Sequence, residues 1–286
     1  MVVPQLEAFC LQIESRTLKN TTKVFATGLA TFALLGTMTA CSTGATTETA
    51  TPTATAAAPA AWSYSGANGP DAWGTLDPNY ATCADGTAQS PIDITETTPA
   101  DLPNITVNYV AGEAGVFNNG HTVEAEPLTE GGETITLDGT DYAFKQFHFH
   151  APSEHAVNGT HYPLEIHFVH KTEDGKIAVV GVFVEEGAEN AAWAPFIADI
   201  ASATDDPEAN KVNIDWAALL PTEQTTVRYD GSLTTPGCAE GVKWNVMTTP
   251  ITMSADQIAA FDAAYDNNAR PVQALNGRVV TLDNTP

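Results

Sequence analysis

Residues 142–150 read YAFKQFHFH, and residues 164–170 read LEIHFVH. Successive side chains of a β-strand point to opposite faces of the strand. At the end of the first segment, a glutamine and two histidines therefore share one face, and two phenylalanines share the other. In the second segment a glutamate and a histidine share one face, with Ile166 and Phe168 opposite them. Both segments predict strands that bury one face in a core and present polar side chains on the other.

More alternating segments lie around these two, and they are separated by Gly, Asn, Asp and Pro residues that favour turns. They cover residues 105–110, 121–126, 134–139 and 177–186. A helical period occurs in two places, residues 193–200 and residues 258–265. The second follows Ser254 and Gln257, which have the spacing of a capping box. Because long helices do not alternate with the strands, we expect a mainly antiparallel sheet and not a doubly wound parallel fold.

The composition limits the class of protein. The chain has 286 residues, of which 43% are hydrophobic, and this is enough for one sizeable core. Asp and Glu number 35 against 11 Lys and Arg, which gives a formal net charge of −24. Such a charge repels phosphate groups, so we expect neither nucleic acid nor an anionic lipid surface as a partner. A solvated acidic surface suited to salty or extracellular surroundings accounts for this charge.

The N-terminal region has the features of an export signal. Lys19 and Lys23 precede an uncharged apolar run, residues 24–40, which has the length of a signal-peptide core. The run ends in MTA before Cys41, which resembles the lipobox of bacterial lipoproteins with Met in place of the usual Leu. We expect a signal peptide over residues 1–41 and lipidation at Cys41, with ordinary cleavage or an uncleaved anchor as alternatives. The residues before Lys19 include two glutamates and fit no signal peptide, which favours a translational start downstream of the first Met.

Behind the expected export signal, the chain is expected to contain a tether and a single domain. Residues 42–61 are a Thr/Ala/Pro-rich tract with little to bury, so we expect a flexible tether followed by one domain over residues 62–286. The protein should reach the periplasm or the cell surface and contact the membrane only through its lipid. Once Cys10 and Cys41 are set aside, Cys83 and Cys238 remain. An oxidising compartment favours a disulfide between them over two free thiols.

The histidines indicate a metal site. All seven lie within residues 121–170, and His148, His150 and His167 fall on the polar faces of the two strands quoted first. If these strands are neighbours, three imidazoles meet at one point. Three neutral imidazoles leave one position of a tetrahedral Zn²⁺ open for water, although other divalent ions also bind three histidines.

Two further side chains fit a metal site of this kind. Gln146 and Glu165 each lie two residues before a histidine on the same strand face. There they can accept the second N–H of the imidazole and fix its tautomer. Val169 lies on the same face of the second strand and is expected to face the metal.

The sequence resembles the α-class carbonic anhydrases over nearly all of residues 62–286. The motifs that carry the likeness are WSY at 62–64, NGP at 68–70, QSPID at 89–93, NNGH at 118–121, QFHFH at 146–150, SEH at 153–155, EIHFVH at 165–170, GSLTTP at 231–236 and NARP at 268–271. Ala151-Pro152 departs from the Trp-Gly of the animal enzymes. That dipeptide and the cysteine pair are similar to the bacterial, exported branch of the family.

The resemblance implies a fold and an activity. The fold is a large twisted, mostly antiparallel central sheet with short peripheral helices, and residues 62–286 form the catalytic domain. The activity is the zinc-dependent, reversible hydration of CO₂ to bicarbonate and a proton, with one Zn²⁺ per chain. The oligomeric state stays open, and a homodimer is one of the alternatives.

The resemblance also implies roles for single residues. The zinc ligands are His148, His150 and His167, and the groups that orient them are Gln146, the backbone carbonyl of Asn268, and Glu165 respectively. The hydroxide that attacks CO₂ donates its hydrogen to Thr234, which donates its own to Glu154. The proton shuttle is His121, and Asn119 helps to order the cavity water. The walls of the CO₂ pocket are Val169, Val179, Leu233 and Trp244, with Thr235 on its polar side.

The remaining three histidines are not expected to bind the metal. His155 and His170 match structural positions of the family, and His161 is expected at the surface. The spacing of His148, His150 and Glu154 also fits the first metal motif of cupins, but that class needs another histidine downstream and none follows His170. The second rival is a non-catalytic surface zinc or binding module on the same fold, which usually lacks one of the ligands.

Overall fold

The computed structural model describes residues 60–129 and 131–283, which belong to one compact unit. The predicted signal peptide, the lipidation site at Cys41 and nearly all of the tether lie outside these residues. No helix within the described part of the chain has the length and apolar character needed to cross a membrane.

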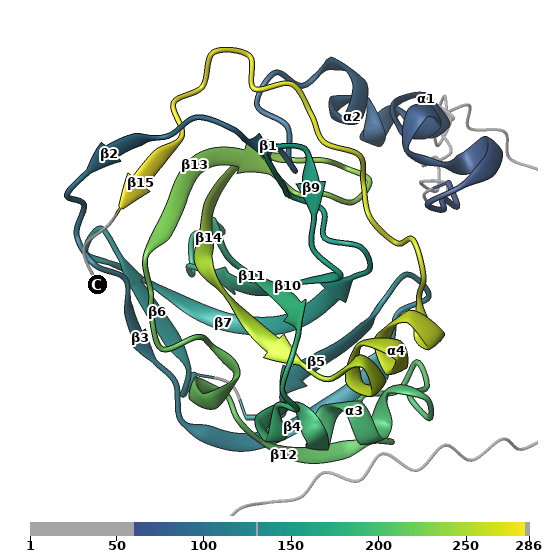
Figure 1. Cartoon of the computed structure of the whole chain (residues 1–286). Helices are drawn as coiled ribbons and strands as arrows, with labels where there is room; N and C mark the ends of the chain where they lie inside the picture. The colour runs from purple at the N-terminus through teal and green to yellow at the C-terminus, as the bar shows by residue number, and fades with distance from the viewer. Residues whose placement is uncertain (1–59, 130, 284–286) are drawn as a thin grey trace, which may run out of the picture. The chain divides into compact units, whose positions relative to one another are not determined.

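Twelve strands of the described residues form one large twisted sheet (Figure 1). The strand order is β12-β4-β5-β7-β10-β11-β14-β13-β15-β2, and β6 pairs with both β7 and β3. The strands of this sheet are β2 (Thr98–Ala100), β3 (Thr106–Asn108), β4 (Ala111–Asn118), β5 (Val123–Pro127), β6 (Thr134–Leu137), β7 (Thr140–His150), β10 (Leu164–Lys171), β11 (Ile177–Glu186), β12 (Lys211–Asp215), β13 (Thr226–Ser232), β14 (Glu240–Met253) and β15 (Thr281–Asp283). A second, three-stranded sheet contains β1 (Asp93–Ile94), β8 (Ala156–Val157) and β9 (Thr160–His161).

Most strand pairs of the large sheet are antiparallel, and β11–β14 and β15–β2 are parallel. This confirms the predicted fold class. All six segments with alternating hydrophobicity contribute strands to the sheet, namely β3, β5, β6, β7, β10 and β11. The sequence pattern therefore located the central strands that carry the histidines.

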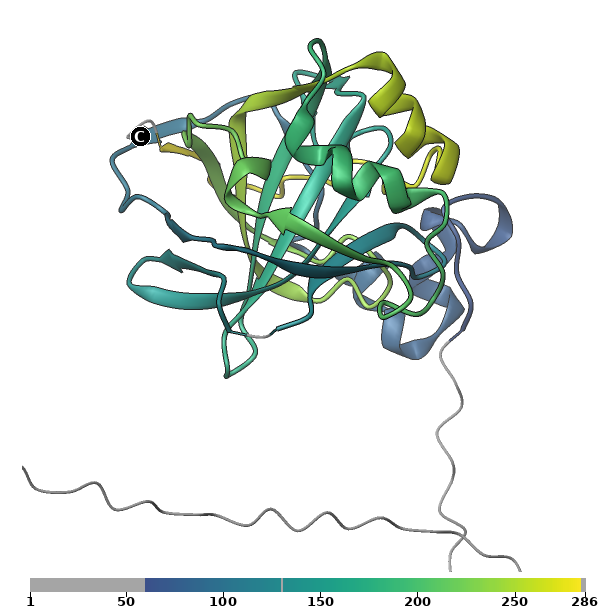
Figure 2. The same cartoon turned by 90° about the horizontal axis from the view of Figure 1, so that it is seen from below.

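The helices are short and lie outside the sheet. They are α1 (Trp73–Leu76), α2 (Thr82–Asp85), α3 (Ala194–Ile200) and α4 (Ala255–Ala264), with 3₁₀ turns at Gly66–Asn68, Pro70–Ala72, Pro78–Tyr80, Ala191–Trp193 and Ala217–Leu219. Figure 2 shows α3 and α4, in green and yellow, as one group, and the blue N-terminal helices as another. The predicted capping box is present at the start of α4, where Ser254 and Gln257 satisfy each other's backbone N–H groups. The N-terminal helices have no helical period in the sequence and were not predicted.

One face of β7 and β10 packs against α3 and α4. Phe147, Phe149, Ile166 and Phe168 are fully buried there. The ring of Phe147 packs edge-on against Phe196 at the start of α3, with ring centroids 4.7 Å apart. Burying such a side chain contributes about 1.5–3 kcal/mol, so this face fixes the orientation of both strands. The opposite face is then free to carry polar side chains.

The strands that sequence analysis did not find include β4 and β14. In β4 the hydrophobic alternation is interrupted by Gly112 and Gly115. A Cβ atom at Gly115 would lie 2.5 Å from the carbonyl oxygen of Pro207, so only glycine fits at this close approach. A tertiary contact therefore requires glycine at this position, and the glycine interrupts the alternation from which a strand would be predicted.

The predicted disulfide between Cys83 and Cys238 is present in the structure and joins α2 to the loop that follows β13. The backbone N–H of Cys238 donates to the carbonyl of Thr235, and Gln89 Nε2 donates to the carbonyl of Cys238. The bridge therefore holds one end of the loop that contains Thr234.

We expect the Cys83→Ser/Cys238→Ser variant to lose about 2–5 kcal/mol of unfolding free energy, because the bridge closes a long loop of the unfolded chain. Urea unfolding of the purified protein measures this loss. Dithiothreitol should destabilise the wild-type protein by a similar amount and leave the variant unchanged. Equal unfolding free energies for variant and wild type would contradict a stabilising bridge.

Candidate metal centre

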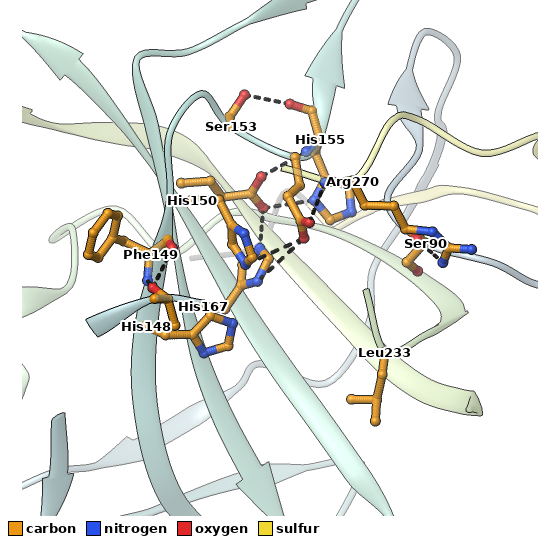
Figure 3. Close-up of polar contacts among 12 residues, drawn as sticks. Ser90, His148, Phe149, His150, Ser153, His155, His167, Leu233 and Arg270 are labelled. Carbon is orange, nitrogen blue, oxygen red and sulfur yellow. Dashed lines mark hydrogen bonds and ion pairs between the residues drawn. The ribbon is translucent and has the colours of Figure 1, made fainter. Parts of the chain in front are cut away.

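The pairing of β7 with β10 brings the predicted histidines together. His148 on β7 lies opposite His167 on β10, and His150 lies opposite Glu165 in the same antiparallel register. One possible ligand nitrogen from each of His148, His150 and His167 lies within 4.8 Å of the other two. Figure 3 shows the three rings gathered on one side of the strands.

Hydrogen bonds fix the tautomers of two of these rings. Nδ1 of His148 lies 2.8 Å from Oε1 of Gln146, and Nδ1 of His150 lies 2.7 Å from the carbonyl oxygen of Asn268. Both oxygens can only accept, so Nδ1 carries the hydrogen in each ring. The lone pair of Nε2 is left for another partner in both cases.

The third ring presents its other nitrogen. Nε2 of His167 lies 3.0 Å from Oε1 of Glu165, which leaves Nδ1 for the metal. Glu165 also accepts hydrogen bonds from the backbone N–H and Nδ1 of His155, and Nε2 of His155 is bonded to the hydroxyl of Tyr229. Burial raises the pKa of Glu165, but the two imidazoles outweigh this effect and hold the pKa well below its usual range. A buried, ionised carboxylate thus supports the third ring.

The charge state and the free nitrogens of this cluster fit a metal ion. Burial lowers the pKa of His148 and of His150, so both rings are neutral, as metal binding requires. Nε2 of His150 is buried and has no hydrogen-bond partner among the described residues. A buried nitrogen of this kind costs free energy unless it finds a partner, and a cation such as Zn²⁺ provides one.

Glu154 lies directly behind the imidazoles. Its Oε1 accepts a hydrogen bond from the backbone N–H of Arg270 at 2.8 Å. Its Oε2 lies 3.5 Å from Nε2 of His150 and 3.9 Å from Nδ1 of His167, and it has no hydrogen-bond partner within residues 60–129 and 131–283. The structure has no hydrogen bond from Thr234 to Glu154 among the described residues, and the Oε2 atom that could accept it faces the two imidazoles.

The three histidines form the floor of a cavity of about 290 Å³. The residues predicted for the CO₂ pocket all line it: Val169, Val179, Leu233, Thr235 and Trp244. Thr234 lines it as well, and Leu233 is drawn in Figure 3. The cavity is thus apolar on one side of the imidazoles, where a small uncharged molecule can lie against them.

The other side of the cavity is polar. Asn119 and His121, which were predicted for the water-filled side, line it together with Gln146. His121 stacks on Trp62, with ring centroids 3.6 Å apart and an interplanar angle of 9°. Partial burial lowers the pKa of His121, so its imidazole is mainly neutral at pH 7 and can accept a proton.

Four residues of the cavity wall were not predicted as site residues, namely Trp62, Tyr64, Thr122 and Glu124. The first two belong to the WSY motif, which could have drawn attention to them. Glu124 has no such signal, since a glutamate in an alternating strand is usually a solvent-exposed residue. Its place in the cavity follows only from the pairing of β5 with β7.

The remaining histidines lie apart from the three-ring cluster or behind it. His155 and His170 are fully buried, and His170 is bonded to the hydroxyl of Tyr109. Burial lowers the pKa of His170 to about 3, so it is neutral at any physiological pH. His161 is exposed, and its Nδ1 donates to the carbonyl of Ser153.

The fold and the site define a class of β-sheet protein in which a histidine cluster lines a cavity beside a large twisted sheet. The family of eukaryotic-type carbonic anhydrases matches residues 68–284. The carbonic anhydrase of Klebsiella pneumoniae is 46% identical over 221 residues, which cover 77% of this chain and 89% of the relative. That of Neisseria gonorrhoeae is 42% identical over 224 residues and covers 77% and 86%.

Solved structures give the same result. The α-carbonic anhydrase from Thermovibrio ammonificans, in complex with the inhibitor sulfanilamide, is 44% identical with a TM-score of 0.71, and the match covers 78% of this chain and 99% of that one. The chain belongs to the carbonic anhydrase family, and the resemblance to its bacterial α-class members is confirmed.

We expect Gln146→Leu to weaken zinc binding by about 10- to 100-fold, because Nδ1 of His148 loses its acceptor and the ring is no longer held in place. Competition with a chromogenic chelator measures this affinity. Gln146→Glu keeps an acceptor at the same position and is the matched control, with an affinity close to that of the wild type. An unchanged affinity in the leucine variant would show that Gln146 does not orient the ring.

Proposed function

We propose that this protein catalyses the reversible hydration of CO₂ to bicarbonate and a proton with one Zn²⁺ held by His148, His150 and His167. The observation that carries the proposal is the cluster of three imidazoles, two buried and one half-buried, that lines a half-apolar cavity. In each ring the nitrogen that faces away from the cluster is bonded to, or lies close to, an oxygen of the protein. Such an arrangement gives a metal three imidazole ligands and leaves one position open.

The metal and the apolar wall have separate tasks. Zn²⁺ supplies a Lewis acid that lowers the pKa of a water molecule, an effect for which carbonic anhydrase is the standard example. Val169, Val179, Leu233 and Trp244 form the wall against which CO₂ is held, since an uncharged, apolar substrate needs contact area and not a charged clamp. Thr235 provides a polar group at the edge of this wall.

Thr234 and Glu154 align the nucleophile. A hydroxyl that donates its hydrogen to a carboxylate is left with only lone pairs for a second partner, so it accepts a hydrogen bond from the attacking oxygen. The proposal therefore requires Thr234 and Glu154 to become hydrogen-bonded when the site is loaded. Oε2 of Glu154 is available for this bond, because it has no hydrogen-bond partner among the described residues.

His121 removes the proton that hydration releases. Its imidazole lines the same cavity as the three histidines and is half-buried at the rim against Trp62. A neutral imidazole in this position takes the proton from the cavity water and transfers it to buffer. Asn119 lies on the same polar side and helps to order that water.

Two other interpretations are weaker. A non-catalytic binding module on the same fold would not need an apolar wall beside the metal together with a neutral imidazole at the rim. A cupin-type enzyme would take Glu154 as a ligand and one more histidine from downstream, and no histidine follows His170.

We also propose that the protein is exported to the periplasm or the cell surface and anchored by a lipid at Cys41. The apolar run of residues 24–40 and the lipobox-like ending support this proposal, as does a disulfide that requires an oxidising compartment. A homodimer stays a prediction that gel filtration can test.

We expect CO₂ hydration by the purified protein to disappear when metal is removed with dipicolinate and to return when Zn²⁺ is restored. His150→Ala should bind zinc poorly and show no return, whereas His161→Ala, which changes an exposed histidine, should behave as the wild type. Stopped-flow measurement with a pH indicator gives the rates, and metal analysis gives the occupancy. Full zinc occupancy without hydration would contradict the enzyme and favour the binding module.

We expect the Cys41→Ser variant, expressed with its full leader in a bacterial host, to leave the membrane fraction and appear in the soluble exported fraction. The lipid is the only membrane contact that we propose, so its loss should release the protein. Fractionation with immunodetection measures the distribution, and Cys10→Ser is the matched control. A Cys41→Ser protein that stays with the membrane would contradict lipid anchoring.

A further inference from the structure

A carboxylate in the cavity wall has no part in the mechanism given so far. Glu124 lies on β5, where it is the strand partner of His148 on β7. It lines the same cavity as the three histidines and His121. Its neighbour on the same strand face, Glu126, does not line the cavity. The position of Glu124 thus differs from that of the other glutamate of the strand.

Glu124 is bonded to the turn that carries His121. Nδ2 of Asn119 donates a hydrogen bond to Oε1 of Glu124. Oδ1 of the same amide accepts from the backbone N–H of His121 at 2.8 Å and from that of Thr122 at 2.9 Å. Asn119 therefore joins the carboxylate of β5 to the backbone of the shuttle residue.

The two ends of an asparagine amide are not interchangeable, because one end only accepts and the other only donates. Oδ1 of Asn119 must face the two backbone N–H groups to satisfy them. Nδ2 then faces β5, where only an acceptor can satisfy it. Glu124 is that acceptor, and it fixes the orientation in which Asn119 can hold the turn.

We propose that Glu124 is a positioning residue for proton transfer, which holds the turn of His121 at the cavity rim through Asn119. This inference rests on the proposed function, in which His121 carries the proton. Its effect is on where the imidazole lies and not on the reaction of CO₂, because Glu124 accepts its hydrogen bond from Asn119 in the turn of His121. The role needs an acceptor at residue 124 and does not need a negative charge.

The test compares two substitutions at one position. Glu124→Leu removes the acceptor and keeps a side chain of similar size, whereas Glu124→Gln keeps an acceptor oxygen and removes the charge. Glu126→Leu makes the same change on the same strand outside the cavity. His121→Ala shows the full effect of losing the shuttle.

The first readout is steady-state CO₂ hydration at low and high buffer concentration. The value of kcat at low buffer includes proton transfer out of the cavity, while kcat/KM reports the steps from CO₂ to bicarbonate. We expect Glu124→Leu to lower kcat at low buffer by about three- to tenfold, a part of the roughly 10²-fold or greater effect of a positioned proton-transfer group. Imidazole added as buffer should restore kcat, and kcat/KM should stay unchanged.

The second readout does not depend on activity. Amide hydrogen exchange, followed by NMR, reports whether the N–H groups of His121 and Thr122 keep their acceptor. We expect both N–H groups to exchange about tenfold faster in Glu124→Leu, because a hydrogen bond that opens more often exposes its N–H to water more often. In Glu124→Gln and Glu126→Leu we expect both to exchange at the wild-type rate. The exchange rates can be measured on the protein with or without bound metal.

The outcomes separate this inference from the function on which it rests. If His121→Ala leaves kcat at low buffer unchanged, the shuttle is wrong, and the exchange rates alone decide whether Glu124 holds the turn. If His121→Ala lowers kcat but Glu124→Leu does not, the positioning role is overturned. An equal loss in Glu124→Gln and Glu124→Leu would overturn it in favour of a charge effect. Equal losses of kcat and kcat/KM in Glu124→Leu would overturn it in favour of general damage to the site.

Discussion

The antiparallel pairing of β7 with β10 is the constraint on which the site depends. In this register His148 lies opposite His167, and the faces that bear them are on the same side of the sheet. A shift of one residue in either strand would turn its whole polar set into the aromatic core and its phenylalanines toward the cavity. The packing of Phe147 against α3 and of Phe168 against Phe147 makes that shift costly. The hydrophobic core on one face is therefore what aligns the imidazoles on the other.

The site is also held by charged groups that the protein keeps out of water. Glu165 is fully buried and stays ionised because two imidazoles contact it. Arg270 is buried as well; its backbone N–H bonds to Glu154, and its guanidinium donates to Gln89 and to the carbonyl of Cys83. Hydrogen bonds of this kind satisfy groups that would otherwise destabilise the core. They also connect the disulfide to the carboxylate behind the histidine cluster.

The local pattern of the sequence was enough to predict the central strands, because alternation over residues 142–150 and 164–170 reports which face is buried. It could not predict the partner of His150, since the carbonyl of Asn268 is 118 residues away and only the fold brings it near. The resemblance to a family supplied that contact. It also supplied a hydrogen bond between Thr234 and Glu154, which stays a prediction for the metal-loaded site.

Some features were identified neither by the local sequence pattern nor by the resemblance to a family, and both examples depend on tertiary contacts. Glu124 has the appearance of an ordinary surface glutamate until β5 is placed beside β7. Gly115 interrupts the hydrophobic alternation of β4, and its small size is required because Pro207, which is distant in sequence, lies close to it. In both cases a tertiary contact determines the residue, and the local sequence of a single strand does not show which strands or segments will lie beside it.

The way the chain enters the domain affects how the protein can be handled. The backbone of Ala60 is bonded to Asp77 and to the hydroxyl of Tyr80, and two residues later Trp62 lies flat against His121. A fusion partner or solid support joined at this end would therefore sit at the rim of the cavity. Figure 1 places β15 at the far side of the sheet from α1 and α2. Coupling through the C-terminal end would leave the contact between Trp62 and His121 undisturbed.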